Sequence, residues 1–458
     1  MSQNREQWGS KLGFILAASG SAVGIGNIWK YPHMAGQNGG AAFTLVYLAC
    51  ILVVGLSIVI AEFVIGRKTQ LSPVGAFEQL APSTNWKWVG FLGVASAFVI
   101  LSFYGVVGGW VLKYVIVSIT GGFNELAGDP DAAGNVFNTF ITDTWSPIIY
   151  QVFFMAFCVW VIVNGVKGGI EKWSKIMMPL IVVLLAVLAV RGMTLPGGMK
   201  GISFLFNPRF EDLTANSIVL ALGHSFFTVS LGMGTMITYG SYLNRKQNLL
   251  NSAVWVIALD TAIAMLAGIA IFTTVFALGA NPAEGPGLIF VVLPSVFSQL
   301  AGGTLWGTMF FVLLFMAALT SAISILEVVT AYFIDQKGWS RKKATIQFGA
   351  VITIVGVFCS LSMGGGVNIT EFLGMPFFDV MDYLSAKYML PIGGMLTAIF
   401  ILRKWGISNY MAELKSGMGD TNISSRLVQV VLTIAAAVVA FIIFNEVYAE
   451  IFGKALIG

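Results

Sequence analysis

Two clusters of glycine lie inside apolar segments of this 458-residue chain, and their spacing points to chemistry. The first segment reads SGSAVGIGNIWKYP and holds Gly20, Gly24 and Gly26. A later one reads HSFFTVSLGMGTMITY and holds Gly232 and Gly234. Glycine costs about 1 kcal/mol relative to alanine in a helix interior, so each cluster predicts an interrupted helix. An interruption frees carbonyl oxygens, which suit a hard cation such as Na⁺, and exposes the amides of a half-helix N-terminus, which suit a carboxylate.

The composition indicates the solvent around these segments. Hydrophobic residues make up 57% of the chain and charged residues 10%, whereas soluble proteins carry about 25% charged residues. This excludes an ordinary water-soluble enzyme and a disordered chain. The formal net charge of +4 is small, and without a dense basic stretch it does not favour a nucleic-acid partner. Three scattered cysteines and two histidines give no metal-site or disulfide pattern.

The apolar residues form segments long enough to cross a bilayer, which takes about 20 residues of helix. They lack the ten-residue alternation of barrel strands, so we expect helices. The fold class predicted is therefore an all-α polytopic membrane protein with 11 transmembrane helices. These lie at residues 12–36, 41–66, 88–119, 147–165, 175–191, 214–240, 250–278, 304–334, 344–363, 377–402 and 427–452. Residues 281–303 suggest a short helical hairpin between two of them.

Basic residues in the short loops predict the orientation. Loops on one side are rich in lysine and arginine, whereas residues 121–146 on the other side contain four acids and no lysine or arginine. The basic side, which includes Arg5 and Lys11, is expected to be cytoplasmic. The N-terminus is therefore expected inside and, after an odd number of helices, the C-terminus outside.

The two glycine clusters fall in the first and the sixth segment, at corresponding places of two five-helix halves. Non-helical backbone at membrane depth is tolerated only where it lines a protein cavity, and paired interruptions are typical of inverted-repeat transporters. The alternative is that these glycines only let helices pack closely. We expect residues 1–200 to form the first inverted repeat and 201–404 the second. Residues 405–458 would then supply a cytoplasmic connection and helix 11.

Three stretches resemble the neurotransmitter:sodium symporter family. SKLGFILAASGSAVGIGNIWKYPHMAGQNGGAAF is similar to its first helix, FFTVSLGMG to its sixth and LLFMAALTSAISI to its eighth. The resemblance runs from Arg5 through the tenth helix. It implies a LeuT-type fold with unwound helices 1 and 6, alternating access, no enzymatic activity and no organic cofactor. Together with the short tails, it also implies a location in the cell (plasma) membrane.

The resemblance implies two sodium sites, each built from oxygens near the interrupted helices. The residues of the first would be Ala22, Asn27, Thr228 and Asp260, and those of the second Gly20, Val23, Ala317, Thr320 and Ser321. Taken alone, Thr320 and Ser321 would be expected to bond back to their own helix. Asp260 stands where the family often has asparagine, and an ionisable residue at mid-membrane depth is a functional hypothesis by default. Its fixed carboxylate predicts chloride-independent transport.

The resemblance also implies a substrate site at the same depth. Its residues would be Ala22, Gly24, Ile25, Gly26, Ile100, Tyr104, Phe227, Thr228, Ser230, Met233, Ser321 and Ile325. Amine-transporting members carry an acid where this chain has Gly24, so an amino acid is favoured. The mostly apolar side chains would solvate a charged substrate poorly, and Met233 adapts to aromatic rings. We expect hydrophobic L-amino acids, aromatic ones (tryptophan, tyrosine, phenylalanine) before leucine.

Charged pairs implied by the resemblance would gate this site on both sides. Outside, Lys30 would pair with Asp382 above a lid of Tyr104 and Phe227. Inside, Arg5 would pair with Asp335 near Tyr242, while Trp8 plugs the vestibule. The alternative for each pair is charges that snorkel to the headgroups.

The sequence thus predicts a secondary transporter that moves an amino acid into the cell with two sodium ions. Proton coupling through Asp260 in the same fold is the principal alternative. A channel or a membrane enzyme is less favoured, because no pore-lining rings and no nucleophile–base pair are evident. The expected partners are the amino acid and the lipid bilayer, and the oligomeric state is left open between a monomer and a homodimer.

Overall fold

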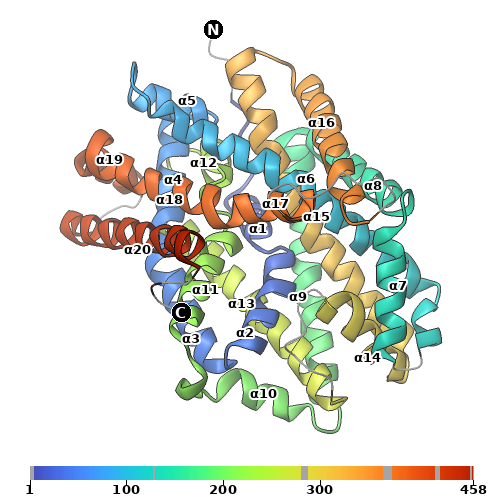
Figure 1. Ribbon diagram of the computed structural model, residues 1–458. Helices are drawn as coiled ribbons and strands as arrows, with labels where there is room; N and C mark the ends of the chain where they lie inside the picture. Colours follow the sequence, from blue (N-terminus) through green and yellow to red (C-terminus); the bar gives the residue numbers. More distant parts are fainter. Residues whose placement is uncertain are drawn as a thin grey trace.

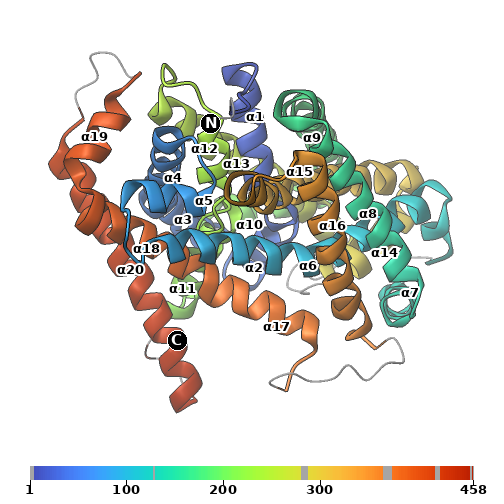
Figure 2. The ribbon, with the colours of Figure 1, turned by 90° about the horizontal axis from the view of Figure 1, so that it is seen from above.

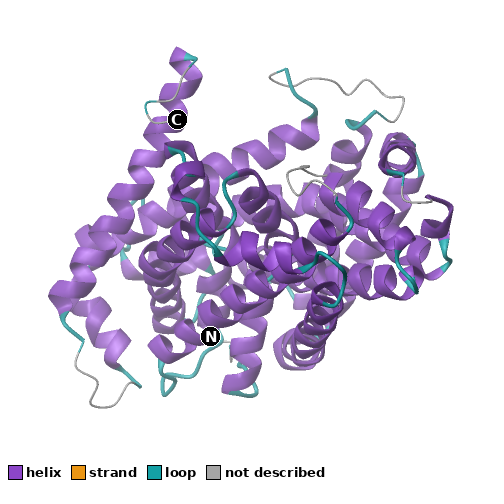
Figure 3. Cartoon of the chain, turned by 90° about the horizontal axis from the view of Figure 1, so that it is seen from below, coloured by secondary structure: helices purple, strands orange, loops and turns teal. Residues whose placement is uncertain are grey.

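The computed structural model describes residues 5–126, 129–279, 287–364, 374–417, 423–453 and 456. Helices and the connections between them make up all of this described part, and no strand occurs in it (Figure 3). The apolar segments therefore fold as helices, which satisfy their own backbone groups in lipid. This confirms the all-α membrane fold class.

The first half of the chain contains five spans, of which the first is broken and the second and fifth each join an α-helical and a π-helical stretch. Their parts are α1 (Lys11–Ala22), η1 (Gly26–Lys30), α2 (Tyr31–Gln37), α3 (Ala41–Cys50), η2 (Ile51–Gly55), α4 (Leu56–Thr69), α6 (Lys87–Ile119), α8 (Ser146–Val163), η4 (Val166–Glu171) and α9 (Lys172–Met193).

The second half continues the same pattern, and its first span is broken as well. Its parts are α11 (Ala215–Thr228), α12 (Thr235–Ser241), α13 (Leu249–Ala277), α15 (Gly303–Lys337), α16 (Arg341–Leu361), α17 (Phe377–Leu384), η7 (Ser385–Met389), α18 (Leu390–Phe400), η8 (Ile401–Trp405) and α20 (Ser425–Phe452).

The number of spans is compatible with the eleven predicted. In the described residues, nine helices are long and apolar enough to cross a bilayer, and the bent pair 11–37 makes a tenth. The sixth predicted segment is divided into α11 of 14 residues and α12 of 7 residues. Each piece is shorter than the roughly 20 residues of a complete span, so neither counts alone.

Shorter helices occupy the connections. They are α5 (Pro73–Leu80), η3 (Gly122–Leu126), α7 (Pro130–Thr142), α10 (Met199–Phe206), η5 (Phe210–Asp212), η6 (Leu288–Val292), α14 (Leu293–Gln299) and α19 (Ile407–Lys415). Where a helical hairpin was suggested at 281–303, one continuous helix runs from Leu288 to Gln299. Residues 281–286 of that prediction lie outside the described residues.

The two broken spans lie at the centre of the bundle. Figure 1 shows α1 near the middle, and both Figures 1 and 2 show α20 and α7 toward opposite edges. α1 packs against α9, α13 and α15, while α12 packs against α4. α20 packs mainly on α18, and only 22% of its most apolar 18-residue stretch is buried by protein. Lipid is therefore the expected surrounding of α20, and protein that of the breaks.

Both predicted interruptions are present. After Ala22 the chain becomes extended at Val23 (ψ 101°), and the helix resumes at Gly26 with its axis turned by 52°. Between Thr228 and Thr235 the backbone takes positive φ at Ser230, Gly232 and Gly234 (53°, 77° and 76°). Glycine is needed at 232, because a Cβ there would lie 2.1 Å from the Leu390 carbonyl oxygen.

Candidate functional site

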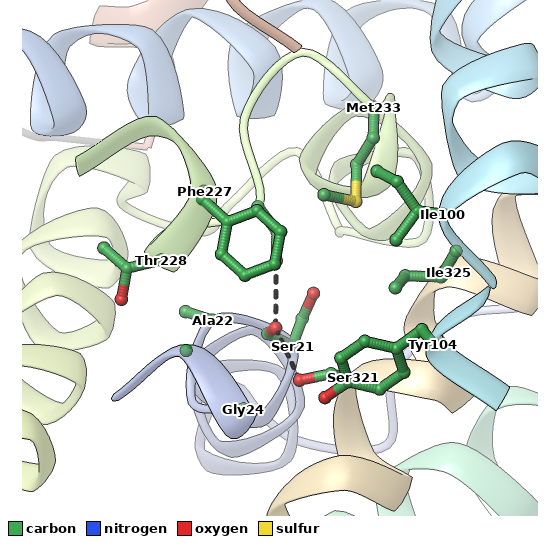
Figure 4. Close-up of a pocket in the computed structure, with 12 residues that line it drawn as sticks. Ser21, Ala22, Gly24, Ile100, Tyr104, Phe227, Thr228, Met233, Ser321 and Ile325 are labelled. Atoms are coloured by element: carbon green, nitrogen blue, oxygen red, sulfur yellow. Dashed lines mark hydrogen bonds between the residues drawn. The ribbon is translucent and has the colours of Figure 1, made fainter. Parts of the chain in front are cut away.

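A small enclosed cavity lies between the two breaks (Figure 4). Its volume is about 20 Å³, which is space for about one water molecule. It is lined by Ser21, Ala22, Gly24, Gly26, Ile100, Tyr104, Phe227, Thr228, Ser230, Met233, Ser321 and Ile325. All the predicted substrate residues except Ile25 line this cavity, and Ile25 lies beside it with its amide directed at the Tyr104 hydroxyl.

One end of the cavity is polar and brings together a backbone amide and two side-chain hydroxyls. The Ile25 amide donates to the Tyr104 hydroxyl oxygen at 3.4 Å. A Cβ at position 24 would lie 2.6 Å from Ser321 Oγ and 3.1 Å from the Tyr104 hydroxyl oxygen. The absence of a side chain at Gly24 therefore keeps these two hydroxyls open to the cavity.

The other end is apolar. Met233 comes from the second break, Ile100 from α6 and Ile325 from α15, and Figure 4 shows the three side chains on one side of the cavity. Each of them is at most 4% exposed. An apolar group is favoured at this end, because a charged one would lose its hydration without a partner.

Where α15 passes the first break, there are more hydrogen-bond acceptor oxygens than donor hydrogens. The Ser321 hydroxyl lies 3.1 Å from the carbonyl oxygen of Ser21, 3.3 Å from that of Val23 and 3.4 Å from that of Gly20. A hydroxyl has only one proton, so it cannot satisfy three carbonyl oxygens at once. The excess of lone pairs is what a cation would use.

Thr320 adds to the same group of oxygens. Its hydroxyl bonds back to its own helix at Met316 and Ala317 (3.1 and 3.0 Å), and it also lies 3.5 Å from the Val23 carbonyl oxygen. The bond back along the helix is therefore present, but it does not exclude a second role. All five residues predicted for the second sodium site are brought together here.

A second polar cluster, which includes the side chains of Asn27 and Thr228, lies around Asp260, which is fully buried in α13. Asp260 Oδ1 accepts from Asn27 Nδ2 at 2.7 Å and from Thr228 Oγ1 at 3.4 Å. Asn27 Oδ1 accepts from the Gly24 amide at 3.2 Å. Asp260 Oδ2 has no hydrogen-bond partner, and no lysine or arginine among the described residues forms an ion pair with this carboxylate. A buried carboxylate without a basic partner is stabilised either by a bound cation or by protonation.

Phe227 divides the small cavity from a larger one above it. The larger cavity has a volume of about 380 Å³ and is lined by Lys30, His224, Phe227 and Asp382, among others. Lys30 Nζ lies 3.6 Å from Asp382 Oδ1 and 4.3 Å from the centre of the Phe227 ring. His224 stacks on Tyr47 at 5.2 Å between ring centres and also lines the larger cavity.

A second charged pair closes the opposite side. Arg5 forms an ion pair with Asp335, donates to Ser241 Oγ at 2.7 Å, and lies 4.6 Å from the centre of the Tyr242 ring. The Trp8 indole donates to the Tyr239 carbonyl oxygen at 3.0 Å. Trp8 is 9% exposed, and its ring contacts those of Phe14, Tyr239 and Tyr242.

The sequence reasoning missed an extension of this inner network. The Tyr242 hydroxyl donates to Glu327 at 2.5 Å, and Arg341 donates to both oxygens of Glu327 at 2.7 and 3.0 Å. The only available signal was an acid inside an apolar helix, at position 327 of α15. Its arginine partner stands 14 residues later, at the start of the next helix.

Comparisons with known proteins identify the family and the fold. The model of the sodium:neurotransmitter symporter family matches residues 5–127 and 141–453. The chain is 41% identical to an uncharacterised sodium-dependent transporter of Bacillus subtilis over 91% of each protein, and 35% identical to one of Haemophilus influenzae over 87% of this chain and 89% of that protein. It also superposes on the crystal structure of MhsT in complex with L-phenylalanine (TM-score 0.87, 46% identity, 96% of this chain and 99% of that one).

The protein is therefore a multi-pass membrane transporter with the LeuT fold and not an enzyme. More particularly, the chain belongs to the sodium:neurotransmitter symporter family. Transport in this family depends on sodium and moves a small molecule.

Proposed function

We propose that this protein carries hydrophobic L-amino acids, foremost aromatic ones, into the cell with two sodium ions and without chloride. The observation that carries the proposal is the meeting of two interrupted helices around a cavity that is polar at one end and apolar at the other. A zwitterion with an apolar side chain matches both ends.

The substrate is assigned by the groups at each end of the cavity. Its carboxylate would face the amides of Ile25 and Gly26 and the Tyr104 hydroxyl, because half-helix amides favour an anion. Its amino group would face carbonyl oxygens near Ala22 and Phe227, with the Thr228 carbonyl and the Ser321 hydroxyl beside them. Because the cavity holds only about 20 Å³, an aromatic side chain enters only if Met233 and its neighbours move. Methionine adapts readily to such a demand, and MhsT was crystallised with L-phenylalanine.

Two sodium ions are assigned, one to the polar cluster around Asp260 and one to the oxygens around Thr320 and Ser321. One ion would bind between Asp260, Asn27, Thr228 and the Ala22 carbonyl, next to the substrate carboxylate. The other would bind among the oxygens of Gly20, Val23, Ala317, Thr320 and Ser321. Each charge that crosses 100 mV yields about 2.3 kcal/mol, and a tenfold gradient about 1.4 kcal/mol. Two ions then supply about 7 kcal/mol, enough for steep accumulation.

Alternating access follows from the position of the gates. Sodium entering from the Lys30–Asp382 side organises the breaks, Phe227 and Tyr104 close over the substrate, and the Arg5–Asp335 side then opens. We assign the Arg5 side to the cytoplasm because of its basic loops, with the N-terminus inside and the C-terminus outside. Residues 1–200 and 201–404 would act as the two inverted repeats, in a monomer or a homodimer.

Uptake by the purified protein in proteoliposomes tests sodium coupling. Radiolabelled tryptophan is expected to accumulate with an inward sodium gradient at least tenfold above its level with potassium alone. The alternative, proton coupling through Asp260, predicts accumulation without sodium under an inward pH gradient. That result would refute the sodium-driven cycle.

Competition among the twenty amino acids tests the substrate class. We expect unlabelled tryptophan, tyrosine, phenylalanine and leucine to displace the labelled substrate, because the apolar end of the cavity offers no partner to a charge. Glutamate and lysine are the controls. Stronger displacement by either one would contradict the assignment.

Replacement of chloride by gluconate tests the role of the fixed carboxylate. Asp260 supplies a negative charge beside the first sodium, so no mobile anion is needed there. Sodium-driven uptake is expected to change by less than twofold. A loss of uptake in gluconate that chloride restores would refute chloride independence.

A further inference from the structure

The N-terminal segment is held to the beginning of the fifth span by a buried acid. Glu171, the last residue of η4, is 2% exposed. Its Oε2 accepts from the Gly9 amide at 2.6 Å, and its Oε1 accepts from Ser10 Oγ at 2.9 Å and Lys175 Nζ at 2.5 Å. Hydrogen bonds to a charged group are among the stronger ones in proteins, so this carboxylate fixes the residues immediately before α1.

A second acid makes the reciprocal contact. Glu6 belongs to the N-terminal segment, and its Oε2 accepts from the Val166 amide at 2.7 Å, at the start of η4. Arg341 donates to Glu6 Oε1 at 2.8 Å. Each of the two segments thus offers a carboxylate to a backbone amide of the other. We call the pair Glu6 and Glu171, with the amides that they bind, the N-terminal clasp.

The clasp fits a close approach of α1 to the fifth span. A Cβ at Gly13 would lie 2.1 Å from Glu171 Oε1, so any side chain at this position would displace the carboxylate. The Arg5–Asp335 pair ties the same N-terminal segment to a different helix, α15. The segment is therefore held on two sides, by the beginning of the fifth span and by α15.

The clasp is connected mechanically to the ion-binding break. α1 begins at Lys11, directly after the held residues, and ends at Ala22, where the carbonyl oxygens of Gly20 and Val23 face Thr320 and Ser321. These twelve residues form one helix. A displacement of its first turn is thus transmitted to the oxygens at its end.

We propose that the N-terminal clasp is a second inner latch, which holds α1 against the fifth span while the inner side is closed and is released when that side opens. Glu171 is a positioning residue in this scheme, because it touches neither the cavity nor the ion-binding oxygens. The inference rests on the proposed transport cycle.

Hydrogen exchange of the full-length protein in detergent, with and without sodium, tests the latch through Glu171→Gln. Glutamine keeps the shape but loses the charge and replaces one acceptor oxygen by an NH₂ group that faces donors. Amides of residues 5–22 and 166–175 are expected to exchange roughly tenfold faster, as the loss of one hydrogen bond to a charged group predicts. Saturating sodium is expected to restore most of the protection, because the ion would bind at the C-terminal end of α1 and hold this helix in its closed position.

Glu78→Gln is the matched control, since Glu78 is an exposed acid of α5 and the exchange pattern should not change there. Glu6→Gln removes the reciprocal contact and should accelerate the same two segments, which keeps the test decisive if Glu171→Gln folds poorly. Unchanged exchange in both variants, or equal acceleration in every helix, would overturn the latch. If the wild-type protein bound no amino acid in the presence of sodium, the transport proposal would be overturned. The exchange result would still show whether the clasp holds α1.

Discussion

Replacing Asp260 with alanine is expected to weaken sodium binding by roughly 100-fold or more. The change removes the one buried carboxylate beside Asn27 and Thr228 and leaves their donors facing a void. Removing one partner of a buried charge pair costs about 3–5 kcal/mol, which corresponds to a factor of at least 100. Sodium-dependent binding of labelled tryptophan to the purified variant measures the effect.

Asp260→Asn separates the charge of this residue from its shape. Asparagine fits the same space and retains an acceptor for the Asn27 amide, so the fold should persist, which a thermal unfolding curve checks. Without the fixed carboxylate, transport is expected to become dependent on chloride and to rise several-fold when chloride replaces gluconate. Sodium affinity equal to that of the wild type in both variants would show that the first ion binds elsewhere.

Gly24→Ala is expected to weaken amino-acid binding by about 10- to 100-fold. The new Cβ would lie 2.6 Å from Ser321 Oγ and 3.1 Å from the Tyr104 hydroxyl oxygen, so both hydroxyls must shift. Overpacking of a well-packed site costs roughly 1–3 kcal/mol, and the methyl group would also occupy the space assigned to the substrate carboxylate. Equilibrium binding of labelled tryptophan at saturating sodium measures the loss.

Gly134→Ala is the control for this substitution. A Cβ there would meet only a Val291 methyl carbon at 3.8 Å, in ordinary contact, so binding should remain at the wild-type level. Affinity within twofold of the wild type in Gly24→Ala would contradict the assignment of the carboxylate to this end of the cavity.

The helical fold and the positions of both breaks were predictable because they depend on local properties of the chain. Apolar length identifies a span, and clustered glycines lower its helical stability whatever surrounds them. The local form of the breaks was less predictable. Ser230 adopts positive φ without being glycine, and the first broken helix resumes at Gly26 as a π-helix. Neither feature has a sequence signal of its own.

Contacts between distant segments explain most of what the sequence alone did not reveal. Glu171 stands 162 residues from Gly9, and nothing in the spacing of the two indicates that they meet. The connection after α13 shows a similar limit. The sequence suggests a helical hairpin within residues 281–303, whereas the described part forms one helix from Leu288 to Gln299. Composition identifies such a stretch as helical but does not determine whether it forms one helix or two.

Main-chain atoms supply much of the cation coordination proposed at Gly20, Val23 and Ala317, and a point substitution does not delete a peptide oxygen. The side chains at the apolar end, such as Ile100 and Met233, contribute no such atom. Divergence at these apolar positions can thus retune cargo preference while the electrochemical drive is inherited unchanged. One scaffold can in this way give rise to paralogues that differ in substrate preference but share the same coupling to the sodium gradient.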